Sequence, residues 1–253
     1  ASPGRRASQR TAHGGGGDQG HKEILCRPLI YNNAVYFTAW SGFVIGVNMD
    51  GSKKWETQVV NSFYYSPANS DPQAGGGKIF CVGANQWNTN SHSGAIACDA
   101  NIGGIVWSTQ NAQSTWATCG ASEDNVPGRS WKHFYTMTTN GYFMAFDADS
   151  GVTPVWRIHN GEKSATGDIM RHHPIEKNGI VYTNSRHAGI IYAFNDNGGS
   201  GSLRWKYKSD VGYCTSSPVP VGDTVYVGTM GGHLMAIAPA VTAAPDKPTE
   251  AKA

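Results

Sequence analysis

Long hydrophobic runs are missing from this sequence, and so is any helical repeat of apolar residues. No stretch of the 253 residues is long and apolar enough to predict a membrane-spanning helix or the hydrophobic segment of a signal peptide. Because no 3.6-residue period is present, we expect very little helix. Charged residues make up only 15% of the chain and the formal net charge is +2, so the basic stripe typical of a nucleic-acid-binding protein is absent.

Common catalytic and metal-binding motifs are also missing. The chain has no H-E-x-x-H or C-x-x-C spacing and no G-x-S-x-G nucleophile motif. The adjacent His172 and His173, with His159 and Asp168 nearby, are the best candidate metal ligands. Because neighbouring residues of a strand point to opposite faces, we do not expect this pair to bind one ion, and we predict no metal site.

The cysteines do not define a disulfide framework. The chain has five, none adjacent to another: Cys26, Cys81, Cys98, Cys119 and Cys214. An odd number leaves at least one free thiol unless a second chain is bridged. Cys98 occupies a hydrophobic position of the repeat described next, so we expect a small buried side chain there. A bond between Cys98 and Cys81 depends on strand register and stays open.

What the chain does contain is a recurring unit of glycine, a short apolar segment, an Asx residue and a segment with tryptophan. Glycine and Asx residues favour turns, so each unit predicts an antiparallel hairpin. The hairpins fall at residues 42–48 with Trp55, 94–99 with Trp107, 141–147 with Trp156, 189–195 with Trp205, and 232–238 without Asx or tryptophan. The Asx residues are spaced by 51, 48 and 48 positions. A small residue recurs near the end of each apolar segment: Gly46, Ala97, Ala145, Ala193 and Ala236.

Two further strands are predicted before each hairpin. One is centred on an aromatic residue: Tyr36, Phe80, Tyr135, Tyr182 and Tyr226. Before it, four copies carry a residue–proline pair: Arg27-Pro28, Ser66-Pro67, His173-Pro174 and Ser217-Pro218. A four-stranded unit repeated at this period indicates an all-β fold, a β-propeller of four-stranded blades with about five repeats.

The ends of the chain suggest how the ring closes and where the folded part stops. The fifth copy lacks its tryptophan strand, and we expect residues 22–26 to supply it, which would remove exposed sheet edges. Residues 1–21 and 239–253 have no apolar run and predict disordered tails around a propeller at 22–238. The start at Ala1 in place of Met is what we expect of a processed chain.

The repeat resembles that of the quinoprotein-like β-propellers, which carry pyrroloquinoline-quinone-type repeats. The resemblance rests on the serine–proline pairs, the aromatic strand, the glycine-to-Asx hairpin and the tryptophan strand, and covers residues 22–238. It implies a propeller, commonly with eight blades. The family includes dehydrogenases and non-enzymatic scaffolds, and this chain is more similar to the scaffold members. It lacks the adjacent cysteines found in many quinoprotein alcohol dehydrogenases.

Tryptophans in phase with the repeat are predicted to dock one blade on the next. These are Trp55, Trp107, Trp156 and Trp205. Long connections at residues 84–93, 110–116 and 159–172 are expected on one face, and the insertion 123–131 on the other. Aromatic and histidine residues outside the repeat phase are therefore predicted to bind a partner: Trp87, His92, Trp116 and Trp131. Trp40 is also out of phase.

Residues next to the prolines are expected to approach the central channel. This channel mouth would contain Arg27, Ser66, Arg171, His172, His173 and Ser217. Such a mouth would hold ordered water, a small anion or a metal, of which water is the prediction.

Two functions remain open from the sequence. The first is a non-catalytic interaction scaffold, or an accessory subunit of a larger and possibly membrane-associated complex, with no catalytic residues and no cofactor. The alternative is a reduced quinoprotein oxidoreductase with pyrroloquinoline quinone and calcium, or a small-ligand binder at the channel mouth. The quinone, calcium and catalytic aspartate positions implied by the enzymes of the family are not recognisable here. By resemblance, the expected location is extracytoplasmic, in the periplasm or an organelle lumen.

Overall fold

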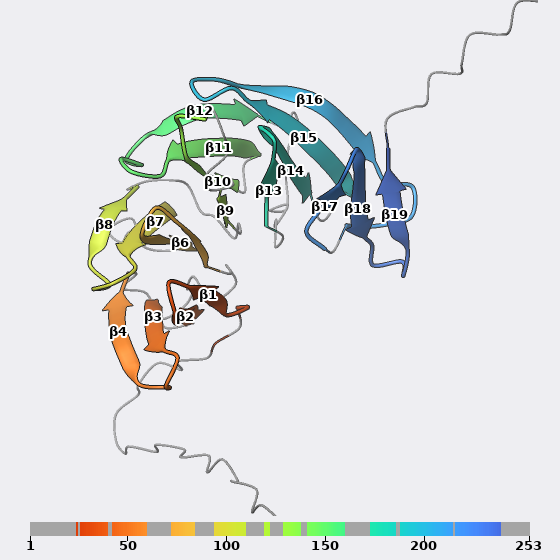
Figure 1. The fold of residues 1–253 in the computed structure, drawn as a ribbon. Helices are drawn as coiled ribbons and strands as arrows, with labels where there is room; N and C mark the ends of the chain where they lie inside the picture. The colour runs from red at the N-terminus through yellow and green to blue at the C-terminus, as the bar shows by residue number, and fades with distance from the viewer. Residues whose placement is uncertain are drawn as a thin grey trace, which may run out of the picture.

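The computed structural model of the chain is all-β and contains the repeat predicted from the sequence (Figure 1). It describes residues 24, 26–39, 42–59, 72–83, 94–109, 119–121, 129–137, 141–159, 173–185, 188–214 and 216–238. Within these residues every regular element is a strand, and the strands form five antiparallel sheets. The sheets follow one another in an open arc with the first and fifth at its ends (Figure 1). No described segment is a helix of the length and hydropathy needed to cross a membrane.

Each sheet is built from strands consecutive in the sequence. The first contains β1 (Leu29–Tyr31), β2 (Ala34–Ala39), β3 (Phe43–Asn48) and β4 (Lys53–Gln58). The second contains β5 (Gln73–Gly75), β6 (Lys78–Gly83), β7 (Gly94–Asp99) and β8 (Ile105–Ser108). The third contains β9 (Cys119–Ala121), β10 (His133–Met137), β11 (Tyr142–Asp147) and β12 (Pro154–His159). The fourth contains β13 (Ile175–Lys177), β14 (Ile180–Ser185), β15 (Ile190–Asp196) and β16 (Gly201–Lys208). The fifth contains β17 (Val219–Val221), β18 (Thr224–Gly228) and β19 (Leu234–Ile237).

In the second and third sheets the Asx residue of the repeat holds the turn between the third and fourth strands. The Asp99 carboxylate accepts the backbone N–H groups of Asn101 and Ile102 at 2.7 and 3.1 Å. In the third sheet the Asp147 carboxylate accepts the N–H groups two and three residues further on in the same way. These hydrogen bonds stabilise the turn. The spacing of the Asx residues in the sequence therefore matches the spacing of the sheets.

Apolar side chains pack between neighbouring sheets and not within a single central core. Tyr36 and Trp55 of the first sheet pack with Ile79 and Cys98 of the second. The same kind of cluster joins the second sheet to the third, the third to the fourth and the fourth to the fifth. Each sheet therefore buries both faces only when it has a neighbour on each side.

Three of the four repeat-phase tryptophans bind the turn of the next sheet. The indole N–H of Trp55 donates to Ala100 O (3.0 Å), that of Trp107 to Ala148 O (3.0 Å) and that of Trp156 to Asp196 Oδ1 (3.1 Å). A glycine lies against each of these rings: Gly103, Gly151 and Gly201. Trp205 packs against the fifth sheet, but no turn follows Ala238 among the described residues, and a cavity of about 380 Å³ lies beside its ring.

The closure of the ring expected from residues 22–26 falls largely on residues outside the described ones. The described Cys26 accepts the backbone N–H of Thr38 on its thiol at 3.2 Å, so Cys26 lies against β2 of the first sheet and not beside the fifth. Described residues of the fifth sheet form only three strands, with β19 at the edge. The reason is the shape of the arc, since the five sheets do not turn far enough to bring the first beside the fifth (Figure 1).

The first strand of the second sheet also differs from the prediction based on Ser66-Pro67. That strand is β5, which directly follows Pro72. Pro72 lies eight residues before Phe80, as Pro28, Pro174 and Pro218 lie before their aromatic residues. The spacing to the aromatic residue, and not the serine, therefore marks the first strand.

The glycine beside each docked tryptophan is testable by mutation. A Cβ atom at Gly151 would lie 2.5 Å from Trp107 Cζ2, whereas at Gly104 the nearest atom would be 3.7 Å away. We expect Gly151→Ala to lower the free energy of unfolding by about 1–3 kcal/mol because the indole must move. Gly104→Ala is the matched control and should change it much less. Equal effects of the two substitutions in urea denaturation would contradict this packing.

Candidate functional site

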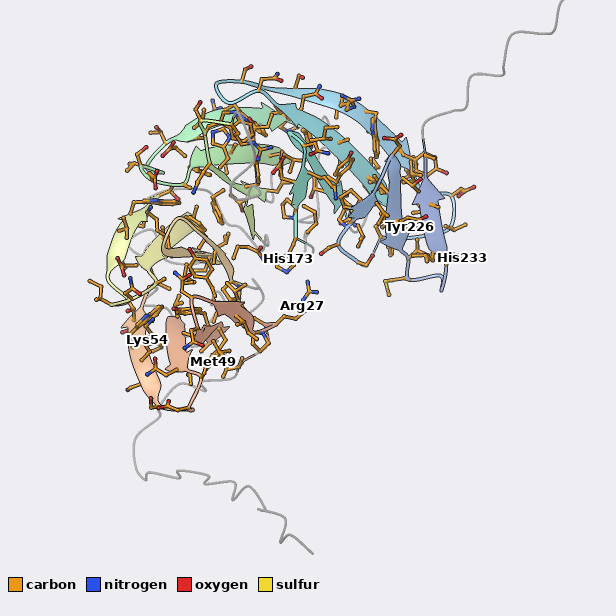
Figure 2. All side chains as sticks on the ribbon, in the orientation of Figure 1. Arg27, Met49, Lys54, His173, Tyr226 and His233 are labelled. Atoms are coloured by element: carbon orange, nitrogen blue, oxygen red, sulfur yellow. The ribbon has the colours of Figure 1, made fainter. Side chains whose placement is uncertain are left out.

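The first strands of the sheets line the centre of the arc and border a cavity of about 500 Å³. Neighbouring first strands lie side by side in the order β1, β5, β9, β13 and β17. Four sheets contribute residues to the cavity: Arg27, Pro28, Gln73, His173, Ile175, Glu176, Lys177, Ser217, Pro218, Val219 and Pro220. In Figure 2, Arg27 and His173 both lie in this central region.

Residues that precede the prolines thus meet in one place. Arg27, His173 and Ser217 all line the cavity, and the His173 backbone N–H donates to Ser217 Oγ at 2.9 Å. A residue before proline is restricted to extended conformations, so each of these segments enters its sheet in the same way. Of the other channel-mouth candidates, Ser66, Arg171 and His172 lie outside the described residues.

The cavity combines positive charge with apolar proline rings. Arg27 and Lys177 carry positive charge at neutral pH, and His173 is an additional nitrogen donor or acceptor. The carboxylate of Glu176 is already paired with another cation, because Arg129 donates to both of its oxygens, at 2.9 and 2.7 Å. Its carboxylate is fully buried and also accepts the Gly179 N–H at 2.5 Å. The arrangement therefore suits a small anion with an apolar part.

A quinone with calcium does not fit the described part of this cavity. The carboxylate that lines it, Glu176, is already bound by Arg129. Calcium in proteins is held by several oxygen ligands, and quinone binding in the family involves stacking on a tryptophan. No tryptophan is among the described lining residues, and the described residues contain no group of three metal-binding side chains close together.

A second polar cluster lies between the third and fourth sheets. Asp196 accepts hydrogen bonds from Trp156 Nε1 at 3.1 Å, Tyr135 Oη at 2.7 Å and the Gly198 N–H at 2.9 Å. His133 Nδ1 lies 2.6 Å from its second carboxylate oxygen. In the first sheet the equivalent tryptophan and tyrosine both bind the Ala100 carbonyl. Here a buried carboxylate replaces that backbone acceptor.

The surroundings of Asp196 control its ionisation. Burial disfavours the charged form and by itself would raise the pKa, but hydrogen bonds from His133, Tyr135 and Gly198 outweigh burial and hold the pKa of Asp196 below its ordinary value. Burial, together with the negative charge of Asp196, raises the pKa of Tyr135, so its hydroxyl stays protonated and donates. The cluster therefore stabilises the ionised carboxylate of Asp196 inside the protein.

Trp131 belongs to the same junction. Its ring stacks on His133 with a centroid distance of 4.6 Å, and the Arg129 guanidinium lies 4.3 Å from its centroid. A Cβ atom at Gly198 would be 2.6 Å from the ring, so the indole also rests on the fourth sheet. The partner-binding role predicted for Trp131 stays a prediction. The other partner-binding candidates, Trp87, His92 and Trp116, lie outside the described residues, as do residues 84–93 and 110–118.

The sequence carried a signal for this cluster that the repeat analysis missed. Asp196 follows the Asx position of the fourth copy, where the other copies have Met49, Ala100 and Ala148. A charged residue at a position that is otherwise apolar indicates a buried polar contact. Lys177, on strand β13, carried no such signal, and only the arc places it at the same cavity as Arg27.

Cys26, Cys81, Cys98 and Cys214 are free thiols. Burial raises the pKa of Cys98 to about 12 and that of Cys214 to about 11. Both therefore remain protonated at neutral pH and act as small apolar residues, as the sequence suggested for Cys98.

Comparison with known proteins agrees with the geometry. The docked sheets and their repeat define a β-propeller with pyrroloquinoline-quinone-type repeats. A family model described as outer membrane protein assembly factor BamB matches residues 97–242, which is more than half of the sequence. The chain belongs to this family. No curated protein matches its sequence significantly.

Solved structures with the same fold are longer than this chain. BamB from Moraxella catarrhalis is 16% identical with a TM-score of 0.58, and the match covers 85% of this chain and 58% of that one. Sqt1 from Saccharomyces cerevisiae is 14% identical with a TM-score of 0.61, covering 81% of this chain and 55% of Sqt1. The WD40 propeller domain of Doa1 is 12% identical with a TM-score of 0.59, covering 86% and 64%. At these identities the similarity shows the fold, and this chain spans less than two thirds of each structure.

Ionisation of Asp196 predicts a pH-dependent stability. Its pKa is lower in the folded protein than the unfolded value of about 3.9, so its contribution is complete above about pH 4 and is lost as the pH falls through the folded pKa. We expect Asp196→Asn to lower the free energy of unfolding by about 2–3 kcal/mol at neutral pH and by less at about pH 3. Urea denaturation at both pH values measures this. Asp210→Asn, at an exposed position, is the control, and an equal loss from Asp196→Asn at both pH values would contradict the assignment.

Proposed function

We propose that this protein is a non-catalytic interaction scaffold or an accessory subunit of a larger assembly. The observation that supports this most directly is the match of residues 97–242 to the family described as an outer membrane protein assembly factor. A frame of sheets docked by buried tryptophans is suited to presenting loops with little change of shape on binding. By the same relationship we propose an extracytoplasmic location, in the periplasm or associated with an outer membrane.

The proposed partner-binding residues are those in the long connections. Trp87, His92 and Trp116 lie in segments that join paired or successive strands of the second and third sheets. Tryptophan contributes large contact area with few rotatable bonds, which makes it a common anchor of protein interfaces. The tryptophans of the repeat are not available for this role in the first three sheets, because Trp55, Trp107 and Trp156 are buried against neighbouring turns.

The scaffold proposal is tested by the native mass of the protein extracted gently from its source. We expect co-migration with an assembly much larger than the 27.0 kDa chain, and expect the double variant Trp87→Ala/Trp116→Ala to migrate as the free chain. Ile102→Ala, at a side chain 76% exposed in the second sheet, should leave the assembly intact. Migration of the wild-type protein as a single 27.0 kDa chain would contradict the proposal.

A second candidate function is favoured by the central cavity. Arg27, Lys177 and His173 line it together with proline rings, which suits a small carboxylate-bearing ligand. Such a ligand would bind on the arc's axis, between the first strands of the sheets.

Calorimetric titration with a small aliphatic dicarboxylate tests this second function. We expect Arg27→Gln to weaken binding about tenfold, because one charge-assisted hydrogen bond of about 1.5 kcal/mol is lost. Lys53→Gln removes an exposed charge on β4 and should have no effect. Absence of binding to the wild-type protein, or equal binding by both variants, would exclude an anion site in the cavity.

A further inference from the structure

The outer strand of each four-stranded sheet lies along the outside of the arc (Figure 1). These strands are β4, β8, β12 and β16, and each pairs with a described strand on one side only. An edge strand exposes main-chain N–H and C=O groups with which another strand can pair, and proteins protect such edges with charged side chains or proline. The four outer strands therefore show how the same edge is protected in four copies of the repeat.

Three of the four outer strands contain protecting residues: Lys53, Lys54 and Glu56 on β4, Pro154 and Arg157 on β12, and Arg204, Lys206 and Lys208 on β16. β8 consists of Ile105, Val106, Trp107 and Ser108, and so has neither a charged residue nor a proline. Among the outer strands, β8 is therefore the one whose own sequence leaves the edge unprotected.

The residue before each repeat-phase tryptophan shows this difference at a single position. In all four sheets this residue forms a β-bulge, because the residues on both sides of it pair with the third strand and it does not. It is Lys54 in the first sheet, Val106 in the second, Val155 in the third and Arg204 in the fourth. The backbone at this position therefore accepts a charged side chain, and the fold does not require valine there.

Exposed apolar side chains lie together at the unprotected edge. Ile105 is 40% exposed and Val106 is 47% exposed. Val152, which is 62% exposed, follows Gly151, and Gly151 lies against the Trp107 ring of β8. The Trp107 indole N–H also donates to a carbonyl of this turn, so the third sheet places Val152 beside β8. We call β8 together with Val152 the uncharged edge, and grouped apolar side chains of this kind mark an interaction surface.

Positive charge surrounds the uncharged edge. The four outer strands contain one acidic residue, Glu56, against six basic ones: Lys53, Lys54, Arg157, Arg204, Lys206 and Lys208. Figure 2 shows Lys54 on the outer strand of the first sheet. Two copies of the chain paired edge to edge would bring these like charges together, which disfavours a second copy as the occupant. An occupant with acidic residues would instead be attracted.

The main-chain groups of the edge disfavour a lipid occupant. Hydrocarbon offers no hydrogen bond to an exposed N–H or C=O group, so burying a strand edge in a membrane is costly. A polypeptide strand, in contrast, pairs with these groups and can cover the apolar side chains at the same time.

We infer that the uncharged edge binds a short apolar β-strand of a partner protein, with acidic residues at the ends of that strand. Main-chain pairing with β8 supplies affinity, and the apolar side chains of the partner cover Ile105, Val106 and Val152. The acidic ends meet the basic residues of the neighbouring outer strands. The inference uses described strands alone and does not rest on the scaffold proposal.

The probe for this site is a short peptide in which valine and threonine alternate between two terminal aspartates. Its binding to the purified full chain is measured by fluorescence anisotropy at low ionic strength, and its position by amide hydrogen exchange. We expect the peptide to slow exchange within β8. We also expect it to bind about tenfold more tightly than a peptide with lysines at its ends or with proline at its centre, because proline cannot donate to a strand ladder.

Val106→Glu tests the edge with little effect on the fold. The same position holds Lys54 in the first sheet and Arg204 in the fourth, so the unfolding temperature should stay unchanged. Peptide binding should weaken about tenfold, because a bound strand would cover the new charge and its aspartates would be repelled. Val221→Glu is the matched control, at a side chain 58% exposed on β17, and should bind the peptide as the wild type does.

Several results would overturn the inference. They are equal binding of the three peptides, binding of none of them, and full binding of the aspartate peptide by Val106→Glu. Self-association of the free chain that Val106→Glu abolishes would overturn it in favour of a second copy. Binding of the chain to anionic phospholipid vesicles without binding of any peptide would overturn it in favour of a membrane surface. The test uses the purified chain, so its outcome is separate from that of the native-mass experiment.

Discussion

The contact between a tryptophan of one sheet and the turn of the next is the interaction on which this structure depends. A four-stranded sheet cannot bury both faces alone, and the indole supplies area, shape and one hydrogen bond at each junction. Trp55 and Trp107 each donate to a backbone carbonyl in the turn of the next sheet. The glycine under each ring allows the close approach, as Gly151 does for Trp107. The repeat is thus a unit of docking as well as a unit of folding.

One junction departs from this rule and becomes more polar. Between the third and fourth sheets the acceptor is the Asp196 carboxylate, which gathers donors from Trp156, Tyr135 and His133. Arg129 and Glu176 form a second buried pair beside it. Buried charges gain little stability over apolar packing but lose much when one partner is removed. This junction therefore tolerates fewer substitutions than the others, and it holds Trp131 against the fourth sheet.

The irregular parts of the structure lie where the repeat is interrupted. The central cavity forms where proline-led segments of four sheets converge without closing a ring. In the fifth sheet Tyr226 pairs with Ala236, and the described residues there include no tryptophan strand. In the regular copies the aromatic residues are buried where one sheet docks on the next. Side chains available to a ligand or partner are therefore expected at the irregular positions. The ligand-binding role proposed for the cavity would use the centre of this arc.

The sequence by itself determined the local units. Asx spacing, central aromatic residues and small residues such as Ala145 mark strands and turns because they act within about ten residues of the chain, through turn bonding and strand pairing. It also predicted which tryptophans face the next sheet. Only the tertiary structure decided that the arc stays open, that Cys26 lies against β2 and that Lys177 and Arg27 line one cavity. Those features depend on the angle between successive sheets. Each angle is set by side-chain packing across a junction, such as that of Asp196 with Trp156. No local sequence pattern encodes the total of these angles over five sheets.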